Sequence, residues 1–167
     1  MADMFDICHG GGLDLCALGL AEIDAMGNVN VSKFHGRVTG PGGFIDLAQH
    51  TKKLILMGTF TAGGLREHCE GGRLVIDREG KYQKFKTDIE QVTFSGDYAA
   101  AHGQHVLVVT ERAVFRLTPQ GLMLTEIAPG VDLERDILSQ MEFRPLIADD
   151  LQLMDGRIFQ PNPMGLS

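Results

Sequence analysis

A glycine-rich segment at residues 38–46 has the residue types of a binding loop. It reads Val-Thr-Gly-Pro-Gly-Gly-Phe-Ile-Asp, with three glycines and one proline between an expected strand and an expected short helix. Glycine allows positive φ values and a close approach of a ligand to the backbone. The amide N–H groups of such a loop can donate to a phosphate or to a polarised oxygen. The segment therefore fits a backbone-amide site for one of these groups, and it also fits a plain turn.

The loop does not carry a nucleotide-binding pattern. It is not G-x-G-x-x-G, and no Lys-Ser or Lys-Thr follows it, so neither dinucleotide nor nucleoside-triphosphate binding is predicted. What remains is a cradle of backbone amides. Asp46, at the end of the segment, could cap the start of the helix or orient a ligand.

The other side chains that could do chemistry are scattered. The six histidines and three cysteines do not form a set of metal ligands, and no Gly-x-Ser-x-Gly motif is present. No metal, disulfide framework or serine nucleophile is therefore expected. The adjacent residues Glu111 and Arg112 end an apolar run. They could form a solvated strand end or a buried, paired carboxylate, and a structural role is favoured over a catalytic one.

The elements that must position these residues are short strands between glycine clusters. A buried strand at residues 13–20 is expected to pair with residues 29–34 as a hairpin. The apolar run at residues 53–60 predicts a central strand covered on both faces. The glycines at 63–64 form a second glycine-rich loop, here called the second glycine mouth, at the carboxyl end of that strand, where open α/β sheets place ligands.

The remainder predicts further strands and two short helices. One helix, at residues 44–49, would place Phe44, Leu47 and Ala48 on one face, and the other covers residues 132–141. Further strands are expected at residues 73–76, 91–94, 105–110, 113–117 and 122–127. The fold class is therefore a strand-rich α/β sheet, with one domain over residues 1–160 and a frayed tail at residues 161–167.

Composition excludes several function classes. The chain has 167 residues, 44% of them hydrophobic and 22% charged, with a net charge of -7. This acidic balance argues against binding to nucleic acid or to an anionic membrane surface. No apolar run approaches the ~18 residues needed to span a bilayer, and the acidic start does not resemble a signal peptide. A cytoplasmic protein is expected.

Five blocks together resemble the C-terminal part of the single-chain acyl-CoA:acetate/3-ketoacid CoA-transferases. The resemblance covers about residues 5–160, and its specificity lies in the order and spacing of the blocks. The blocks are GGGLD at residues 10–14, GNVNVSKF at 27–34, GPGGFID at 40–46, VTERAVF at 109–115 and LTEIAPG at 124–130. The family fold implied is an open α/β sheet of the CoA-transferase type with flanking helices, here incomplete.

The resemblance implies a ping-pong transfer of CoA between carboxylic acids. In the family, a glutamate carboxylate attacks the acyl-CoA and passes through an acyl-glutamyl anhydride to a glutamyl-CoA thioester. The G-x-G-G-(A/F) loop supplies a backbone N–H to the oxyanion. Carried onto this sequence, Gly43 is the donor, Gly40 and Gly42 shape the loop, and Thr39 and Phe44 belong to the CoA-binding segment.

One departure concerns the nucleophile. In the family the glutamate precedes the Gly-Gly-Gly-Leu-Asp block, and no glutamate of this sequence has that context. We therefore expect a truncated C-terminal part that is inactive alone and needs the N-terminal part of the same enzyme. The intact enzyme is expected to be a homo-oligomer that uses acyl-CoA and carboxylate substrates. The alternative is a non-catalytic module of the same fold that binds CoA or another ligand, or serves assembly.

Overall fold

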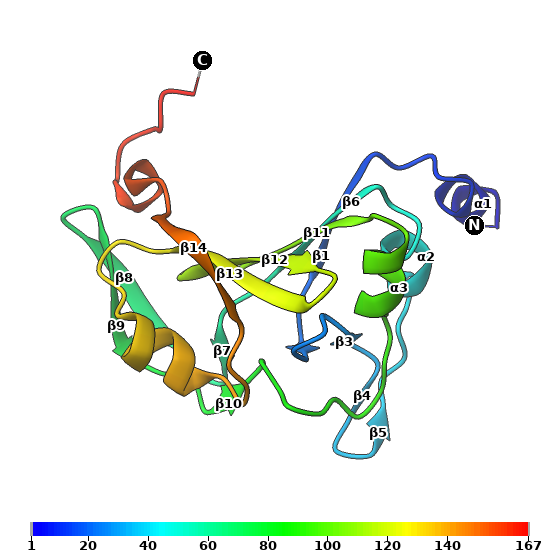
Figure 1. Ribbon diagram of the computed structural model, residues 1–167, viewed down its shortest axis with the longest axis horizontal. Helices are drawn as coiled ribbons and strands as arrows, with labels where there is room; N and C mark the ends of the chain where they lie inside the picture. Colours follow the sequence, from blue (N-terminus) through cyan, green and yellow to red (C-terminus); the bar gives the residue numbers. More distant parts are fainter. Residues whose placement is uncertain (1, 167) are drawn as a thin grey trace.

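The computed structural model describes residues 2–166 and shows a mixed six-stranded sheet surrounded by short helices and two-stranded ribbons (Figure 1). The sheet order is β1-β6-β11-β12-β13-β14. Its strands are β1 (Leu15–Gly19), β6 (Lys53–Met57), β11 (His105–Val109), β12 (Ala113–Thr118), β13 (Gly121–Ile127) and β14 (Leu146–Leu153). Strands β1, β6 and β11 are parallel, β12 is antiparallel to both neighbours, and β14 is parallel to β13.

The remaining elements are short. The ribbons pair β2 (Glu22–Ile23) with β3 (Val29–Asn30), β4 (Lys33–Phe34) with β5 (Arg37–Val38), β7 (Thr61–Ala62) with β10 (Tyr82–Gln83), and β8 (Arg66–Glu70) with β9 (Arg73–Arg78). The helices are α1 (Ala2–His9), α2 (Phe44–Ala48), α3 (Gly96–Ala101), η1 (Leu133–Ile137), η2 (Leu138–Gln140) and η3 (Gly156–Phe159). Three of them begin at side-chain caps, because Ser95 accepts from Tyr98 N, Asp132 accepts from Arg135 N and Asp155 accepts from Arg157 N.

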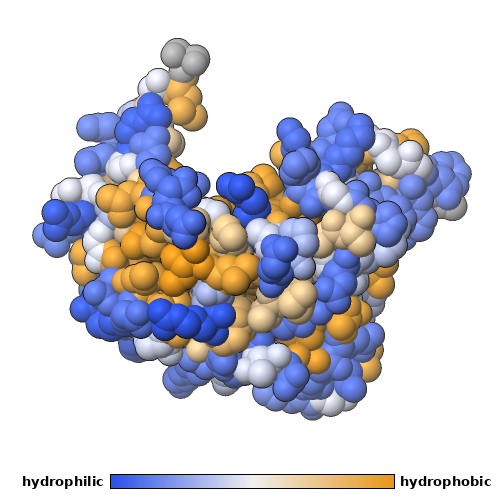
Figure 2. Space-filling model, in the orientation of Figure 1, coloured by the Kyte–Doolittle hydropathy of each residue, from blue (hydrophilic) through white to orange (hydrophobic). Residues whose placement is uncertain are grey.

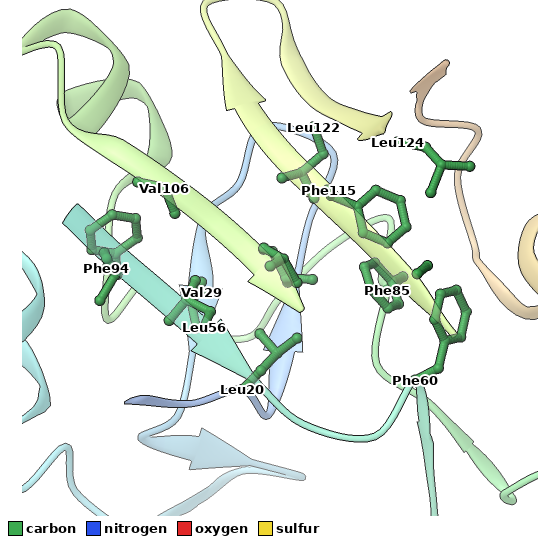
Figure 3. Close-up of a cluster of buried hydrophobic side chains, with 14 of the residues drawn as sticks. Leu20, Val29, Leu56, Phe60, Phe85, Phe94, Val106, Phe115, Leu122 and Leu124 are labelled. Atoms are coloured by element: carbon green, nitrogen blue, oxygen red, sulfur yellow. The ribbon is translucent and has the colours of Figure 1, made fainter. Parts of the chain in front are cut away.

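The main core covers one face of the sheet. Alternation along β6 and β11 turns Leu54, Leu56, Val106 and Val108 toward this face, and each is at most 2% exposed. Phenylalanine rings from two loops meet Phe115 of β12 there (Figure 3). Phe60 lies 4.5 Å from Phe85, and Phe85 lies 5.0 Å from Phe115, between ring centroids. Each buried ring contributes roughly 1.5–3 kcal/mol through burial alone.

The opposite face of the sheet is largely uncovered. The register places Ala17, Ile55, Leu107, Arg116 and Met123 side by side across five strands. Leu107 is 36% exposed and Arg116 is exposed. A second, smaller cluster of Leu74, Val114, Ala128, Met154 and Phe159 covers only one end of this face. Apolar surface is also visible around β13 and β14 in Figure 2.

The prediction of an α/β sheet is confirmed, whereas several details of the strands are wrong. The strand at residues 13–20 is not buried. It is the edge strand β1, with Leu15 54% exposed, and it pairs in parallel with β6 instead of forming a hairpin with residues 29–34. The hairpin belongs to β2 and β3. Strand β6 lies inside the sheet, next to the edge strand β1, but it is covered on one face only, since Lys53 and Met57 are exposed.

Other differences lie toward the end of the chain. Residues 91–94 form no strand; Phe94 contributes only an isolated bridge to Val29. The helix expected at residues 132–141 is divided into the π-helical turn η1 and the 3-10 turn η2. Strand β14 was not predicted, because its alternation is interrupted by Asp149 and Asp150. Residues 161–166 contain no helix or strand, and the frayed tail stays a prediction.

Candidate functional site

The glycine loop connects the β4–β5 ribbon to helix α2. The amides of Thr39 and Gly40 donate to the carbonyl oxygen of Ser32, over 2.8 and 3.2 Å, and anchor the start of the loop. Gly40 and Gly42 have φ values of +81° and +56°. Side chains rarely adopt this left-handed region, so the path of the loop requires glycine at both positions.

Gly43 is the residue at which the loop becomes helix α2. Its φ and ψ are -87° and 10°, and the Phe44 amide donates to the carbonyl of Pro41 over 3.1 Å, which closes a tight turn. Within residues 2–166, neither the Gly42 amide nor the Gly43 amide donates to another protein atom. The loop therefore has two neighbouring backbone donors without a protein acceptor among these residues.

The other predicted members of the loop have different surroundings. Thr39 is exposed, and its hydroxyl lies 3.4 Å from the carbonyl oxygen of Val31. Phe44 is only 9% exposed and packs into the main core with Ala48. The Phe44 side chain thus supports the loop from the core side, and its contact with CoA stays a prediction.

Helix α1 packs against the end of the loop. An ideal Cβ built on Gly43 would lie 3.2 Å from Cε1 of Phe5, which is tight. His9 Nε2 lies 2.6 Å from Asp46 Oδ1. Asp46 therefore contacts α1, and no side chain caps the start of α2. The capping alternative for Asp46 is therefore wrong, and its role in orienting a ligand stays a prediction.

A cavity lies elsewhere, beside the carboxyl ends of β1 and β6. It has a volume of about 710 Å³ and extends between the β4–β5 ribbon and the β7–β10 ribbon, both below the sheet in Figure 1. None of residues 39–44 lines it. Its apolar walls are Leu20, Ala21, Phe34, Ala62 and Tyr82. A cavity of this size suits a small ligand or part of a larger one.

Charged side chains line the same cavity. They are Lys81, Lys84, Lys86, Glu22, Asp88 and Glu90, with His35 beside them. Glu90 accepts from the amides of His35 and Gly36, and this bonding, chiefly from Gly36, holds the pKa of its carboxyl below the ordinary value. The tip of the β4–β5 ribbon is thereby tied to the segment that carries the lysines.

Lys84 lies against the ends of strands β1 and β6. Its Nζ donates to the carbonyl oxygen of Leu20 over 3.0 Å. The same atom lies 2.9 Å from the ideal Cβ position of Gly58, just past β6. Burial lowers the pKa of this ammonium, and the nearby Glu111 raises it by a smaller amount.

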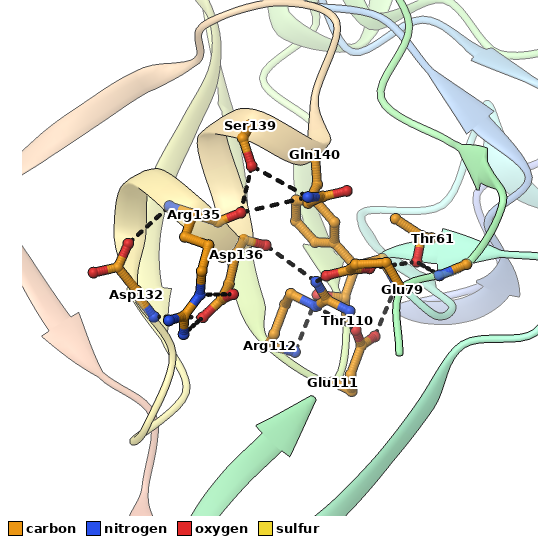
Figure 4. Close-up of polar contacts among 12 residues, drawn as sticks. Thr61, Glu79, Thr110, Glu111, Arg112, Asp132, Arg135, Asp136, Ser139 and Gln140 are labelled. Atoms are coloured by element: carbon orange, nitrogen blue, oxygen red, sulfur yellow. Dashed lines mark hydrogen bonds and ion pairs between the residues drawn. The ribbon is translucent and has the colours of Figure 1, made fainter. Parts of the chain in front are cut away.

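Glu111 and Arg112 form the centre of a buried polar network (Figure 4). The Arg112 side chain is 0% exposed; its Nε lies 2.6 Å from Glu111 and its Nη1 lies 2.5 Å from Glu79. Its guanidinium also lies 5.0 Å from the Phe60 ring centroid. The second oxygen of Glu111 accepts from Phe60 N over 2.8 Å. The buried-pair alternative therefore describes this motif, and its structural role stays a prediction.

Sequence reasoning missed the cavity and its lysines. The signal available was the spacing of Lys81, Lys84 and Lys86 after the second glycine mouth, but spacing alone does not show which lysine is enclosed. That mouth does lie near the cavity, since an ideal Cβ on Gly63 would meet Cδ2 of Tyr82 at 2.6 Å. Among the described residues, no group of histidine, cysteine and carboxylate side chains could hold a metal ion. No described helix is long and apolar enough to cross a membrane.

The comparisons with known proteins point to CoA-transferases. Over 165 residues the chain is 50% identical to acetate CoA-transferase YdiF of Escherichia coli K12, covering 99% of the chain and 31% of that protein. Over 172 residues it is 48% identical to caffeate CoA-transferase of Acetobacterium woodii, covering 98% of the chain and 32% of that protein. No protein-family sequence model matches the chain.

Solved structures agree with the sequence matches. Crystal structures of the acyl-CoA transferase YdiF of E. coli O157:H7, as the apoenzyme and as a thioester complex with CoA, match all of this chain with a TM-score of 0.97 and 50% identity. The chain covers 32% and 33% of those chains. The fold is thus that of a part of a CoA-transferase.

The chain accordingly belongs to the CoA-transferase family, as the resemblance predicted. It spans about a third of the length of these two curated relatives.

Proposed function

We propose that this chain is the part of a CoA-transferase that supplies the oxyanion loop and a section of the CoA site. The observation that carries the proposal is the 50% identity to acetate CoA-transferase YdiF over 99% of the chain. The free amides of Gly42 and Gly43 support it, because they give the predicted loop the donors that its role requires.

In this proposal the reaction transfers CoA from an acyl-CoA to a carboxylic acid. A glutamate carboxylate attacks the thioester carbonyl, and the anhydride forms as the CoA thiolate leaves. The thiolate then attacks the glutamyl carbonyl and expels the acyl carboxylate, which leaves a glutamyl-CoA thioester. An acceptor carboxylate repeats these steps in reverse and takes the CoA. The nucleophilic glutamate is contributed by polypeptide outside these 167 residues.

The Gly43 amide would act at each tetrahedral intermediate. Negative charge develops on the carbonyl oxygen there, and a preorganised N–H stabilises it more in the transition state than in the ground state. One such donor is worth about 2.7–4 kcal/mol, or roughly 10²–10³ in rate. Gly40 and Gly42 hold the loop in the path that presents this donor.

The uncovered sheet face is proposed to receive the rest of the enzyme. Leu107 and Ile55 lie next to Arg116 in one row across it, so the face is apolar with a central cation. YdiF of E. coli and the caffeate CoA-transferase are about three times as long as this chain, which provides polypeptide to cover it. We propose this remaining polypeptide as the occupant.

The test replaces the matching 165-residue segment of E. coli YdiF with this chain. The chimera is expected to transfer CoA from acetyl-CoA to a short carboxylic acid, whereas the 167 residues alone are not. In the chimera, Gly43→Ala should lower turnover by about tenfold to a hundredfold, because the new Cβ presses on Phe5 and moves the donor.

The matched control is Gly156→Ala. Gly156 has no atom within 4 Å of its ideal Cβ, so this variant should keep the activity of the chimera. Unchanged turnover in Gly43→Ala, with the control also unchanged, would remove the oxyanion role. A folded chimera without transfer would contradict the assignment of the whole chain. Hydrogen exchange tests the docking: amides of β6 and β11 should exchange more slowly in the chimera than in the isolated chain.

A further inference from the structure

The cavity beside the carboxyl ends of β1 and β6 is lined by a lysine, Lys84, whose charge is not paired by a carboxylate among the described residues. Lys84 Nζ donates to the carbonyl oxygen of Leu20 over 3.0 Å. An ammonium has three N–H donors, and among the described residues this is its one hydrogen bond. Lys84 also lines the cavity, so its remaining donors are available there.

The acidic side chains around Lys84 are mostly engaged with other groups. Glu22 accepts from Nδ2 of the Asn30 side chain over 2.8 Å, and Glu90 accepts from the backbone amides of His35 and Gly36. Glu111 is held by Arg112 and Phe60 N, and Lys84 forms no ion pair with it. Asp88 is exposed at the cavity and has no partner among the described residues. Lys84 is therefore a partly desolvated cation without a paired carboxylate.

The two neighbouring lysines differ from Lys84. Lys86 forms an ion pair with Glu142, which satisfies its charge inside the chain. Lys81 is exposed and stands beside Tyr82 at the second glycine mouth. The cavity thus has one enclosed free cation, one neutralised cation and one exposed cation.

We propose that Lys84 is the anion-binding group of this cavity. The ligand class is a compact oxyanion, a carboxylate or a phosphate, borne by a molecule with an apolar portion. The oxyanion would contact Lys84 at the strand ends, and the apolar portion would lie against Phe34 and Tyr82. An anion there replaces the hydration that Lys84 has lost, and partial desolvation strengthens the attraction between the two charges.

This site is separate from the glycine loop, because residues 39–44 do not line the cavity. The proposal goes beyond the transferase assignment and does not depend on it. A failed transfer assay with the chimera would leave the anion site intact, and loss of the anion site would leave the oxyanion role of Gly43 untouched.

The experiment follows the backbone amides of the chain by NMR during titration with sodium pyrophosphate and, separately, sodium butyrate. Sodium chloride at matched ionic strength corrects for screening. With at least one probe, the amides of Ala21 and Lys84 should shift in a saturable way. A response to pyrophosphate alone assigns the site to phosphate, and a response to butyrate alone assigns it to carboxylate.

Variants identify the group responsible. Lys84→Met should weaken binding of the responsive probe by about tenfold or more, since a hydrogen bond to a charged group is lost. The matched control Lys53→Met removes an exposed lysine from β6 and should change affinity by less than about twofold. Lys84→Gln serves as a second variant if Lys84→Met is unfolded.

Two results would overturn the proposal. One is the absence of saturable shifts at Ala21 and Lys84 with both probes in the wild-type chain. The other is undiminished affinity in a folded Lys84 variant, or an equal loss in Lys53→Met.

Discussion

Arg112 provides the sharpest test of how the fold is held together. Its guanidinium is fully buried and bridges Glu111, which follows β11, to Glu79, which follows β9. Its Nη1 also donates to the carbonyl oxygen of Asp136 in η1, over 3.1 Å. One side chain therefore connects three segments that are far apart in sequence.

The perturbation is Arg112→Met, which keeps much of the apolar stem and removes the charge. The carboxylates of Glu111 and Glu79 then lose their shared cation. They stay largely buried, since the two side chains are only 16% and 28% exposed. Breaking a buried pair in this way costs about 3–5 kcal/mol. Loss of the Phe60 cation–π contact adds to this cost, by about 0.5–2 kcal/mol. A loss of this size is a large fraction of a typical domain stability of about 5–15 kcal/mol.

The assay is urea unfolding of the wild-type chain and the variant at neutral pH, followed by circular dichroism. Arg116→Met is the matched control, because Arg116, four residues further along in strand β12, is exposed and forms no ion pair among the described residues. The control should change the free energy of unfolding by no more than about 0.5 kcal/mol. A loss below about 1 kcal/mol in Arg112→Met, or an equal loss in the control, would refute the assignment of this network as a structural centre.

Two predictions concern pH. Burial lowers the Lys84 pKa below its ordinary 10.5, so the unfolded chain binds more protons in the window just below that value and stability rises there with pH. Lys84→Met should remove this rise and make the chain more stable at neutral pH; an unchanged pH profile contradicts it. The Arg135 side chain holds the Asp136 pKa below its ordinary 3.8. The charged Asp136 therefore stabilises the folded chain above this value, and the stabilisation is lost as pH falls through the folded pKa. Asp136→Asn should cost about 1–2 kcal/mol at neutral pH and nothing in strong acid, measured by thermal unfolding; an equal cost at both pH values contradicts it.

The local chemistry of the chain was readable from the sequence. The glycine loop and the short helix after it follow from residue types alone, because glycine conformations and helix periodicity are local properties. Strand β6 was found in the same way, as were β11, β12 and β13. The ordered motif blocks further indicated the CoA-transferase family, and the comparisons confirmed it.

Strand pairing and coverage were not readable in this way. Residues 13–20 are as apolar as a buried strand, yet β1 lies at the edge of the sheet with one face uncovered. Nothing local tells a strand which neighbour it will pair with, since hydrogen bonding between strands is satisfied equally well by several partners. Strand β14 was missed for the opposite reason, because polar residues at an edge are compatible with a strand but do not signal one.

The two candidate sites, the glycine loop and Lys84, differ in the same way: one could be predicted from local sequence and the other depends on the tertiary structure. The sequence by itself indicated a turn at residues 40–43 whose backbone amides could reach a ligand, because glycine permits the positive φ values that Gly40 and Gly42 adopt. Only the tertiary structure decided that Lys84 is an enclosed cation and Lys86 a neutralised one. The two are alike in sequence, and what separates them is the position of Leu20 and Glu142, which lie 64 and 56 residues away along the chain. Desolvation and charge pairing depend on such distant neighbours, so they exist only once the chain has folded.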